Sequence, residues 1–140
     1  MSEPIIIEKT ETTPEVIFDK ENSVFRITGR SIVENAHEFY HPIREWLIEY
    51  IKDPNEKTEL TLNYEYLNSS SSLQLMKLIF ILEELTESGK KVKVEWLHER
   101  DDDMTKERGE ELMNSSELDF DIKGYIDESD DDYEDFSFDF

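Results

Sequence analysis

The stretch YLNSSSSLQLM, residues 66–76, joins a segment that alternates like a β-strand to a segment that repeats like an α-helix. Leu60, Leu62 and Tyr64 precede it and alternate with polar residues, which predicts a strand. The apolar density after it predicts a central helix that is covered on most sides. A further strand is expected after residues 88–89, and strand, helix and strand with a short return indicate a crossover between parallel neighbours. The apolar residues of the helix are Leu73, Met76, Leu78, Ile79, Phe80, Ile81, Leu82 and Leu85.

The segments around this crossover predict a single α/β domain with a mixed β-sheet flanked by helices. Residues 15–28 alternate on both sides of a polar turn, which predicts a β-hairpin. Residues 35–51 carry apolar side chains at helical spacing. Pro42 lies inside that run, so we expect a kink there or a helix that begins near His41. Further along the chain we expect a strand at Val92, Val94 and Trp96, an acidic helix over residues 101–113 and a last strand at Leu118, Phe120 and Ile122.

The composition limits the number of domains, the partners and the location. A chain of 140 residues with 36% apolar content has enough apolar material for one core. The formal net charge of −21 repels nucleic acid and anionic membranes, so we expect protein partners. The absence of cysteine excludes disulfides and thiolate chemistry. No signal peptide and no membrane-spanning run of about 20 apolar residues is evident, which predicts a cytoplasmic protein without membrane insertion.

The charge pattern divides the chain into a domain at residues 1–126 and an acidic tail at residues 127–140. The tail, DESDDDYEDFSFDF, contains eight acidic residues and no Lys or Arg. Such a composition favours a solvated, flexible tail. A second interpretation stays open, in which the tail is a docking motif that orders on a basic partner. Its aromatic residues are Tyr133, Phe136, Phe138 and Phe140.

The four consecutive serines offer more hydroxyls than one helix start requires. The first N–H groups of a helix are unpaired and the helix dipole adds positive charge, so this junction favours an anion. In one account Ser70 or Ser71 caps the helix, which contributes about 1 kcal/mol, and the other serines fill a tight loop. In the other account one hydroxyl accepts a phosphoryl group, adds a charge of roughly −1.5 to −2 and thereby prevents binding of a partner. The two accounts are compatible.

Three blocks of sequence resemble, in order and spacing, the SiaC family of bacterial regulatory phosphoproteins across roughly residues 10–122. The blocks are TPEVIFDKENSVFRITGRSIVENAHEFYHPIREWL, LNYEYLNSSSSLQLMKLI and VKVEWLHERDDDMTKERGEE. Within the first block, Ser31, Glu34 and Asn35 resemble the Ser-Tyr-Pro-Glu-Asn segment of the family. Within the second, Asn68 and Ser69 resemble its Asn-Thr-Ser-Ser core. The chain departs from the family where Ile32 and Val33 replace Tyr-Pro, and where Leu73 replaces a Lys.

This resemblance implies a non-enzymatic partner-switching protein. A cognate Ser/Thr kinase would phosphorylate the hydroxyl after Asn68, and a PP2C-type phosphatase would remove the phosphate. The unphosphorylated form would bind and activate a diguanylate cyclase, and so act in c-di-GMP signalling and biofilm control. The acceptor would be Ser69, with Ser70 and Ser71 less favoured. No cofactor is implied.

The same resemblance implies a partner-binding surface formed by Glu34, Asn35, Asn68, Ser69 and Ser70. Glu34 and Asn35 also suit the start of a helix, since Asn is a good N-cap and Glu interacts favourably with the helix dipole. Both readings of this pair stay open. More loosely, a serine at the junction of strand and helix resembles the STAS domains of anti-sigma-factor antagonists. An antagonist that binds an anti-sigma kinase is therefore the alternative function.

An enzyme is the contrasting hypothesis, because HEFYH at residues 37–41 matches the HExxH pattern of zinc hydrolases. Pro42 follows immediately and is expected to break the helix that should present His37 and His41. A third ligand is not evident. We therefore expect ordinary histidines, no metal and no catalytic activity. Asp101 to Asp103 are expected to cap a helix rather than to bind calcium.

Overall fold

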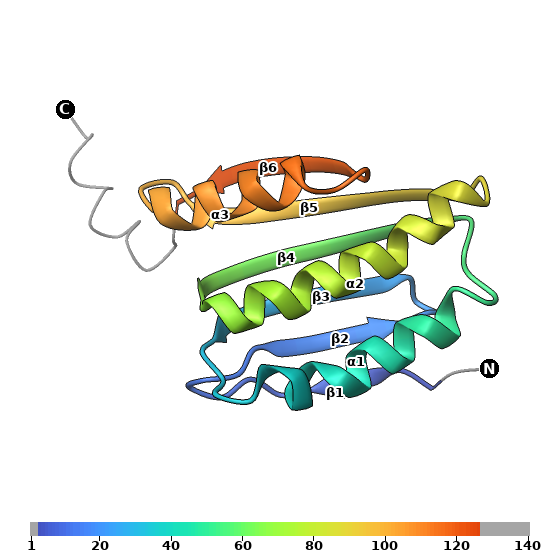
Figure 1. The fold of residues 1–140 in the computed structure, drawn as a ribbon, viewed down its shortest axis with the longest axis horizontal. Helices are drawn as coiled ribbons and strands as arrows, with labels where there is room; N and C mark the ends of the chain where they lie inside the picture. The colour runs from blue at the N-terminus through green and yellow to red at the C-terminus, as the bar shows by residue number, and fades with distance from the viewer. Residues whose placement is uncertain (1–2, 127–140) are drawn as a thin grey trace.

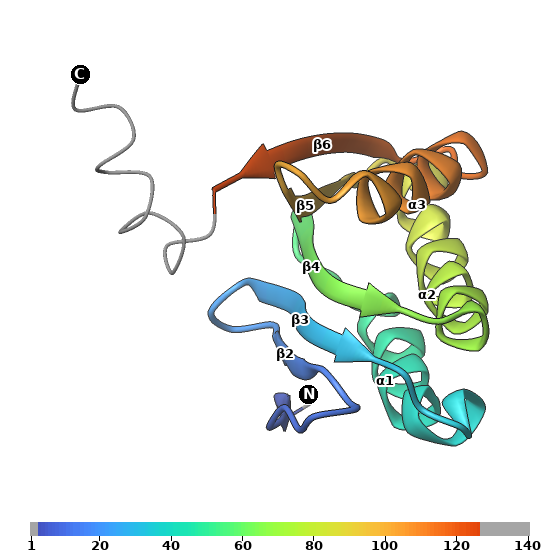
Figure 2. The ribbon, with the colours of Figure 1, turned by 90° about the vertical axis from the view of Figure 1, so that its left-hand side faces the viewer.

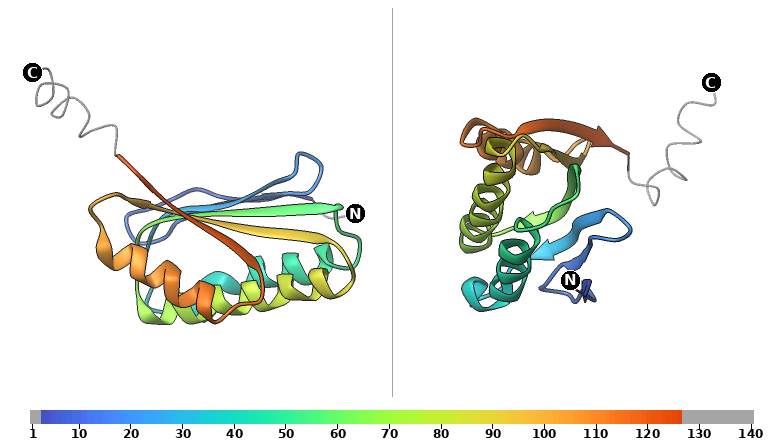
Figure 3. Two further views of the ribbon diagram at one scale, coloured as in Figure 1. Left: turned by 90° about the horizontal axis from the view of Figure 1, so that it is seen from above. Right: turned by 90° about the vertical axis from the view of Figure 1, so that its right-hand side faces the viewer.

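Three helices pack on one face of a six-stranded sheet in the computed structural model, which describes residues 3–126 (Figure 1). Among residues 3–126, no helix lies on the other face of the sheet, as the side views show (Figures 2 and 3). The predicted mixed sheet is therefore confirmed, with its helices on one side. The elements are β1 Ile5–Ile7, β2 Glu15–Asp19, β3 Val24–Ser31, α1 Ala36–Tyr50, β4 Lys57–Leu67, α2 Ser69–Glu87, β5 Lys91–Glu99, α3 Asp103–Asn114 and β6 Asp119–Tyr125.

The strand order follows the chain order, from β1 at one edge to β6 at the other. The pairs β1–β2 and β2–β3 are antiparallel, which confirms the predicted hairpin. The pairs β3–β4, β4–β5 and β5–β6 are parallel, and one helix joins the strands of each pair. Parallel crossovers share one handedness. Because all three advance in the same direction across the sheet, they place all three helices on the same face.

The core lies between the sheet and this helix layer. In β4 the residues Thr58, Leu60, Leu62 and Tyr64 alternate inward, as the sequence pattern predicts. At the hairpin end of the sheet, aromatic rings pack in edge-to-face, tilted or stacked pairs at centroid separations of 5.0–6.1 Å. Such pairs add about 0.5–1.5 kcal/mol each beyond their burial. These rings belong to Phe18, Phe25, Trp46 and Tyr50.

Helix α1 begins at Ala36 and runs through Pro42 to Tyr50, so the predicted start near His41 is wrong. Asn35 caps the helix, because its side-chain oxygen accepts the Glu38 N–H at 3.2 Å. A proline inside a helix costs about 3 kcal/mol. Tyr40 is fully buried in the turn before Pro42, and this packing together with the cap outweighs the missing hydrogen bond.

Helix α2 packs on the sheet and on α1, but its outward side is exposed, so the prediction that it is covered on most sides is too broad. Leu73 is 59% exposed and Phe80 is 51% exposed. The three helices form a single layer with α2 in the middle (Figure 2). The outward side of α2 therefore meets no other described element. The buried apolar residues of the helix are Leu75, Leu78, Ile79, Leu82 and Leu85.

Helix α3 packs so closely on β5 that only glycine fits at one position. Asp102 caps this helix through the Thr105 N–H at 3.0 Å, as the acidic triplet predicts. The Trp96 indole N–H donates to the Thr105 carbonyl at 2.9 Å. A Cβ added at Gly109 would overlap the Trp96 ring. Gly109 weakens the helix locally but permits this contact.

Replacing Gly109 by Ala is expected to lower the free energy of unfolding by about 1–3 kcal/mol, the usual cost of overpacking. In an open helix the same change would stabilise by about 1 kcal/mol, so the sign of the effect tests the contact. Urea unfolding measures the difference. Glu107→Ala, at an exposed position of α3, is the control and should change stability by less than about 0.5 kcal/mol. A more stable Gly109→Ala protein would contradict this packing.

Candidate functional site at the start of helix α2

Asn68 directly follows β4 and caps α2. Its backbone is extended, with φ −77° and ψ 171°, and its side-chain oxygen accepts the Ser71 N–H at 2.9 Å. The helix itself begins at Ser69. The prediction that Ser70 or Ser71 caps the helix is therefore wrong. The Asn68 side chain also donates to the Val33 carbonyl at 3.3 Å, which fixes the loop before α1 against the start of α2.

The four serines of the first turn face four different surroundings. Ser69 is exposed, and its hydroxyl makes no hydrogen bond to any described residue. Ser70 is also exposed, and it donates to Asn68 at 3.3 Å. Ser71 is 0% exposed, whereas the Ser72 hydroxyl accepts a hydrogen bond from Arg108 at 2.8 Å. A modifying enzyme can therefore reach Ser69 and Ser70, but not Ser71.

A chain of buried hydroxyls runs from Ser71 into the core. Ser31 donates to Ser71 at 2.8 Å, and its oxygen lies 2.7 Å from the Tyr40 hydroxyl. The Tyr40 and Tyr64 hydroxyls are 3.1 Å apart. Because Ser31 gives its single proton to Ser71, Tyr40 donates to Ser31 and Tyr64 donates to Tyr40. The chain thus links α2, β3, α1 and β4 through donors that all point toward the helix start.

Burial keeps the two tyrosines of this chain uncharged. Desolvation raises the pKa of Tyr40 above its ordinary value of 10.0, although hydrogen bonds with Ser31, Tyr64 and Ser71 partly offset the effect. Desolvation raises the pKa of Tyr64 further, and its neighbour Tyr40 adds to the rise. No buried side-chain oxygen or nitrogen of the described residues lacks a hydrogen-bond partner. The chain is therefore a complete neutral network, the favourable case for buried polar groups.

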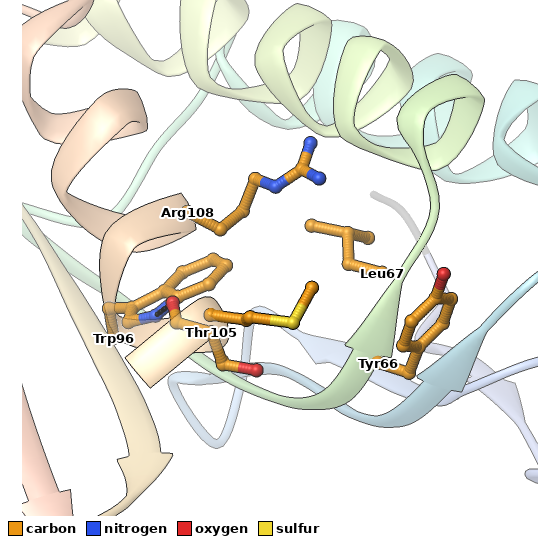
Figure 4. Close-up of a pocket in the computed structure, with 6 residues that line it drawn as sticks. Tyr66, Leu67, Trp96, Thr105 and Arg108 are labelled. Atoms are coloured by element: carbon orange, nitrogen blue, oxygen red, sulfur yellow. Dashed lines mark hydrogen bonds between the residues drawn. The ribbon is translucent and has the colours of Figure 1, made fainter. Parts of the chain in front are cut away.

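A small pocket of about 50 Å³ opens beside the serines, between β4 and α3 (Figure 4). Tyr66 and Met104 at its rim are 48% and 76% exposed. The Arg108 side chain extends from α3 toward α2 across this space (Figure 4). The start of α2 is therefore bordered by apolar side chains and one cation. The pocket is lined by Tyr66, Leu67, Trp96, Met104, Thr105 and Arg108.

The residues predicted for partner binding lie at one edge of the sheet, where β3 and β4 both end. Asn68 donates its backbone N–H to Ser31 at 3.0 Å, and its side chain holds Val33. Glu34 and Asn35 follow directly in that loop and are exposed. The structure therefore brings the two predicted segments together. The cap reading of Asn35 is confirmed, and its contact with a partner stays a prediction.

His37 and His41 lie on α1 with their ring centroids 6.1 Å apart. The helix continues through Pro42, so the expected break after His41 is wrong. Arg44 is placed between the rings. One of its terminal nitrogens lies 3.3 Å from His37 Nε2 and 3.1 Å from His41 Nδ1. The positive charge of Arg44 in this position disfavours the binding of a metal cation by the two histidines. Within residues 3–126, no group of three or more potential ligands gathers to hold a metal ion.

The sequence alone did not predict two arginines that donate hydrogen bonds to side chains of α2. Arg44 donates to the Gln74 side chain at 3.0 Å, and Arg108 donates to Ser72. Each pair is separated by 30 residues or more along the chain, so no local pattern signals it. The predicted tail lies outside the described residues. Among the described helices, none has the length and apolar content needed to cross a bilayer.

The fold and the sequence of this chain define a class of regulatory phosphoproteins. The sequence profile of the SiaC family regulatory phosphoproteins matches residues 7–125. The chain therefore belongs to the SiaC family, as its three blocks of sequence predicted. An uncharacterized protein of Pseudomonas aeruginosa strain UCBPP-PA14 is 28% identical over 116 residues, which cover 83% of this chain and 92% of that protein.

Solved structures of SiaC share the fold. The crystal structure of apo-SiaC from Pseudomonas aeruginosa superposes with a TM-score of 0.80 at 28% identity, and covers 89% of this chain and 100% of that one. A second structure, of the diguanylate cyclase SiaD in complex with its activator SiaC from the same species, gives a TM-score of 0.81 at 27% identity. It covers 86% of this chain and 99% of that one.

Replacing Ser71 by Ala is expected to lower the free energy of unfolding by about 1–3 kcal/mol, because the Ser31 hydroxyl loses its buried acceptor. Urea unfolding measures the loss. Ser70→Ala, one residue earlier and exposed, is the matched control and should change stability by less than about 0.5 kcal/mol. Equal effects of the two substitutions would show that the buried chain does not hold the helix start.

Alkaline pH is expected to destabilise the fold through Tyr40 and Tyr64. Both hold their protons more tightly in the folded chain than in the unfolded one. The stability linked to them is complete below the unfolded pKa, near 10, and is lost as the pH rises above it. Urea unfolding at a series of pH values measures the slope. Tyr64→Phe should show a shallower loss, and parallel slopes would contradict the assignment.

Proposed function

We propose that this protein is a phosphorylation-controlled activator of a diguanylate cyclase. A cognate Ser/Thr kinase phosphorylates Ser69, and a PP2C-type phosphatase removes the phosphate. The unphosphorylated form binds the cyclase. The observation that carries the proposal is the position of Ser69, which is exposed, directly follows the capping Asn68 and opens α2 in a chain of the SiaC family.

A solved relative supports the choice of partner. SiaC of Pseudomonas aeruginosa is the activator of the diguanylate cyclase SiaD, with which it forms a complex. This chain shares the fold at 27% identity. The proposed role is binding, without catalysis by the chain itself, and it contributes to c-di-GMP signalling and biofilm control. The nucleotide substrates of the kinase and the cyclase place the cycle in the cytoplasm.

The surface around Ser69 explains how a phosphate prevents binding. Tyr66 and Met104 expose large apolar groups at the rim of the pocket, and Leu73 is exposed one turn after Ser69 on α2. An interface that covers these groups removes water from Ser69 as well. A phosphate adds a charge of roughly −1.5 to −2, and burying it costs several kcal/mol unless the partner supplies cations. The bare serine carries no such penalty.

The direct test is cyclase activation by two forms of the full chain, one bare and one with phosphoserine installed at position 69 during synthesis. SiaD-type diguanylate cyclases encoded in the same genome are the targets, and c-di-GMP formed from GTP is measured. Phosphorylation is expected to weaken activation at least tenfold, which corresponds to about 1.4 kcal/mol of binding free energy. Mass spectrometry of protein from its native host should place the phosphate on Ser69.

The control is phosphoserine at Ser115, an exposed residue at the far end of α3. It adds the same charge away from the site and should leave activation unchanged. Equal activation by the bare and Ser69-phosphorylated forms would refute the proposed control. Binding of an anti-sigma kinase instead of a cyclase would support the alternative role as an anti-sigma-factor antagonist.

A further inference from the structure

We propose that Arg108 is the residue of this chain that binds the phosphate on Ser69 and selects that serine over its neighbour. The inference rests on the proposed function, because it assigns the phosphate to Ser69. It concerns a side chain on α3, far from the serines in sequence. It therefore adds a specificity determinant to the site at the start of α2.

The first argument is the geometry of one helical turn. Arg108 reaches across from α3 and donates to the Ser72 hydroxyl at 2.8 Å. Ser69 precedes Ser72 by three residues, so the two lie on the same side of α2, with Cβ atoms about 5–6 Å apart. A phosphoryl group lengthens the Ser69 side chain and carries three acceptor oxygens. The guanidinium at Ser72 is then within reach of them.

The second argument is the bonding state of Arg108. Within residues 3–126, the Arg108 side chain makes one hydrogen bond, which goes to a neutral hydroxyl, and it takes part in none of the ion pairs. The guanidinium has five N–H donors in a planar fork that matches phosphate. Exchanging a neutral acceptor for a phosphate roughly doubles the strength of each hydrogen bond. A phosphate on Ser69 therefore competes well with Ser72 for this side chain.

The third argument is the placement of the other arginine. Helix α2 lies between α1 and α3 (Figure 1), and Arg44 approaches it from α1. Arg44 binds the Gln74 side chain at 3.0 Å, four residues after Ser70 and on the same side of the helix. Arg44 thus lies on the side of α2 that carries Ser70, and Arg108 lies on the side that carries Ser69. The two arginines provide an internal comparison.

An ion pair with Arg108 also changes the surface that a partner meets. The guanidinium borders the pocket lined by Tyr66, Leu67 and Met104. Drawn to Ser69, it holds the phosphate beside this apolar surface instead of leaving it free in solvent. The phosphorylated state is then a defined structure, in which a charged pair stands at the site where the cyclase is proposed to bind.

The test is a phosphorus NMR titration of the full chain with phosphoserine installed at position 69. The second pKa of a phosphoserine is ordinarily about 6. A neighbouring guanidinium favours the dianion, so Arg108→Gln is expected to raise this pKa by about half a unit or more. Arg108→Lys keeps the charge but lacks the planar guanidinium, so its phosphate pKa should lie between those of the parent protein and Arg108→Gln. The other charged residues of α2 and α3, including Lys77, Asp103 and Glu107, are the same in all variants.

Arg44→Gln is the matched control and should titrate like the parent protein. Coincident curves for the parent and Arg108→Gln would overturn the inference, and so would an equal shift in Arg44→Gln. Because the phosphate is installed during synthesis, the result does not depend on any kinase or cyclase. A clear shift together with unimpaired cyclase activation would defeat the proposed function and leave the ion pair standing.

Discussion

The buried hydrogen bonds from Tyr64 through Tyr40 and Ser31 to Ser71 fix the rotation of α2 about its axis. Ser71, the third residue of α2, is held inward. Because successive residues of an α-helix are about 100° apart around the axis, this orientation sets the directions of Ser69, Ser70 and Ser72. Ser69 and Ser70 turn to solvent, and Ser72 turns toward α3. The exposure of Ser69, the proposed phosphosite, thus follows from a buried hydrogen-bond network.

The four serines have three different roles, and none of them is the N-cap. Asn68 takes the cap, which leaves every hydroxyl free for another role. One serine is a buried acceptor, one anchors an arginine, and two are exposed beside apolar side chains. A small hydroxyl residue suits position 71 in particular, since a larger side chain there would displace Ser31.

Local patterns predicted the parts of the fold that depend on neighbouring residues. The hairpin, the crossover and the acidic helix each follow from alternation, helical spacing or a cap within about 15 residues. Errors arose where distant contacts decide. The buried Tyr40 keeps α1 helical through Pro42, and the single helix layer leaves Leu73 exposed. Strand β1 has three residues, too few to show a period, and depends on pairing with β2.

The lysines of β5 and β6 and the two arginines beside α2 have partners of different charge. On the open face of the sheet, Lys123 pairs with Glu95 at 2.9 Å and Lys93 with Asp121 at 3.6 Å. A new anion at either of these pairs must displace a carboxylate, for a small gain in high dielectric. Beside α2, Arg44 and Arg108 bind neutral partners instead. In a protein with 36 acidic and 15 basic residues, cations without carboxylate partners are the ones a phosphate can engage without breaking an existing pair.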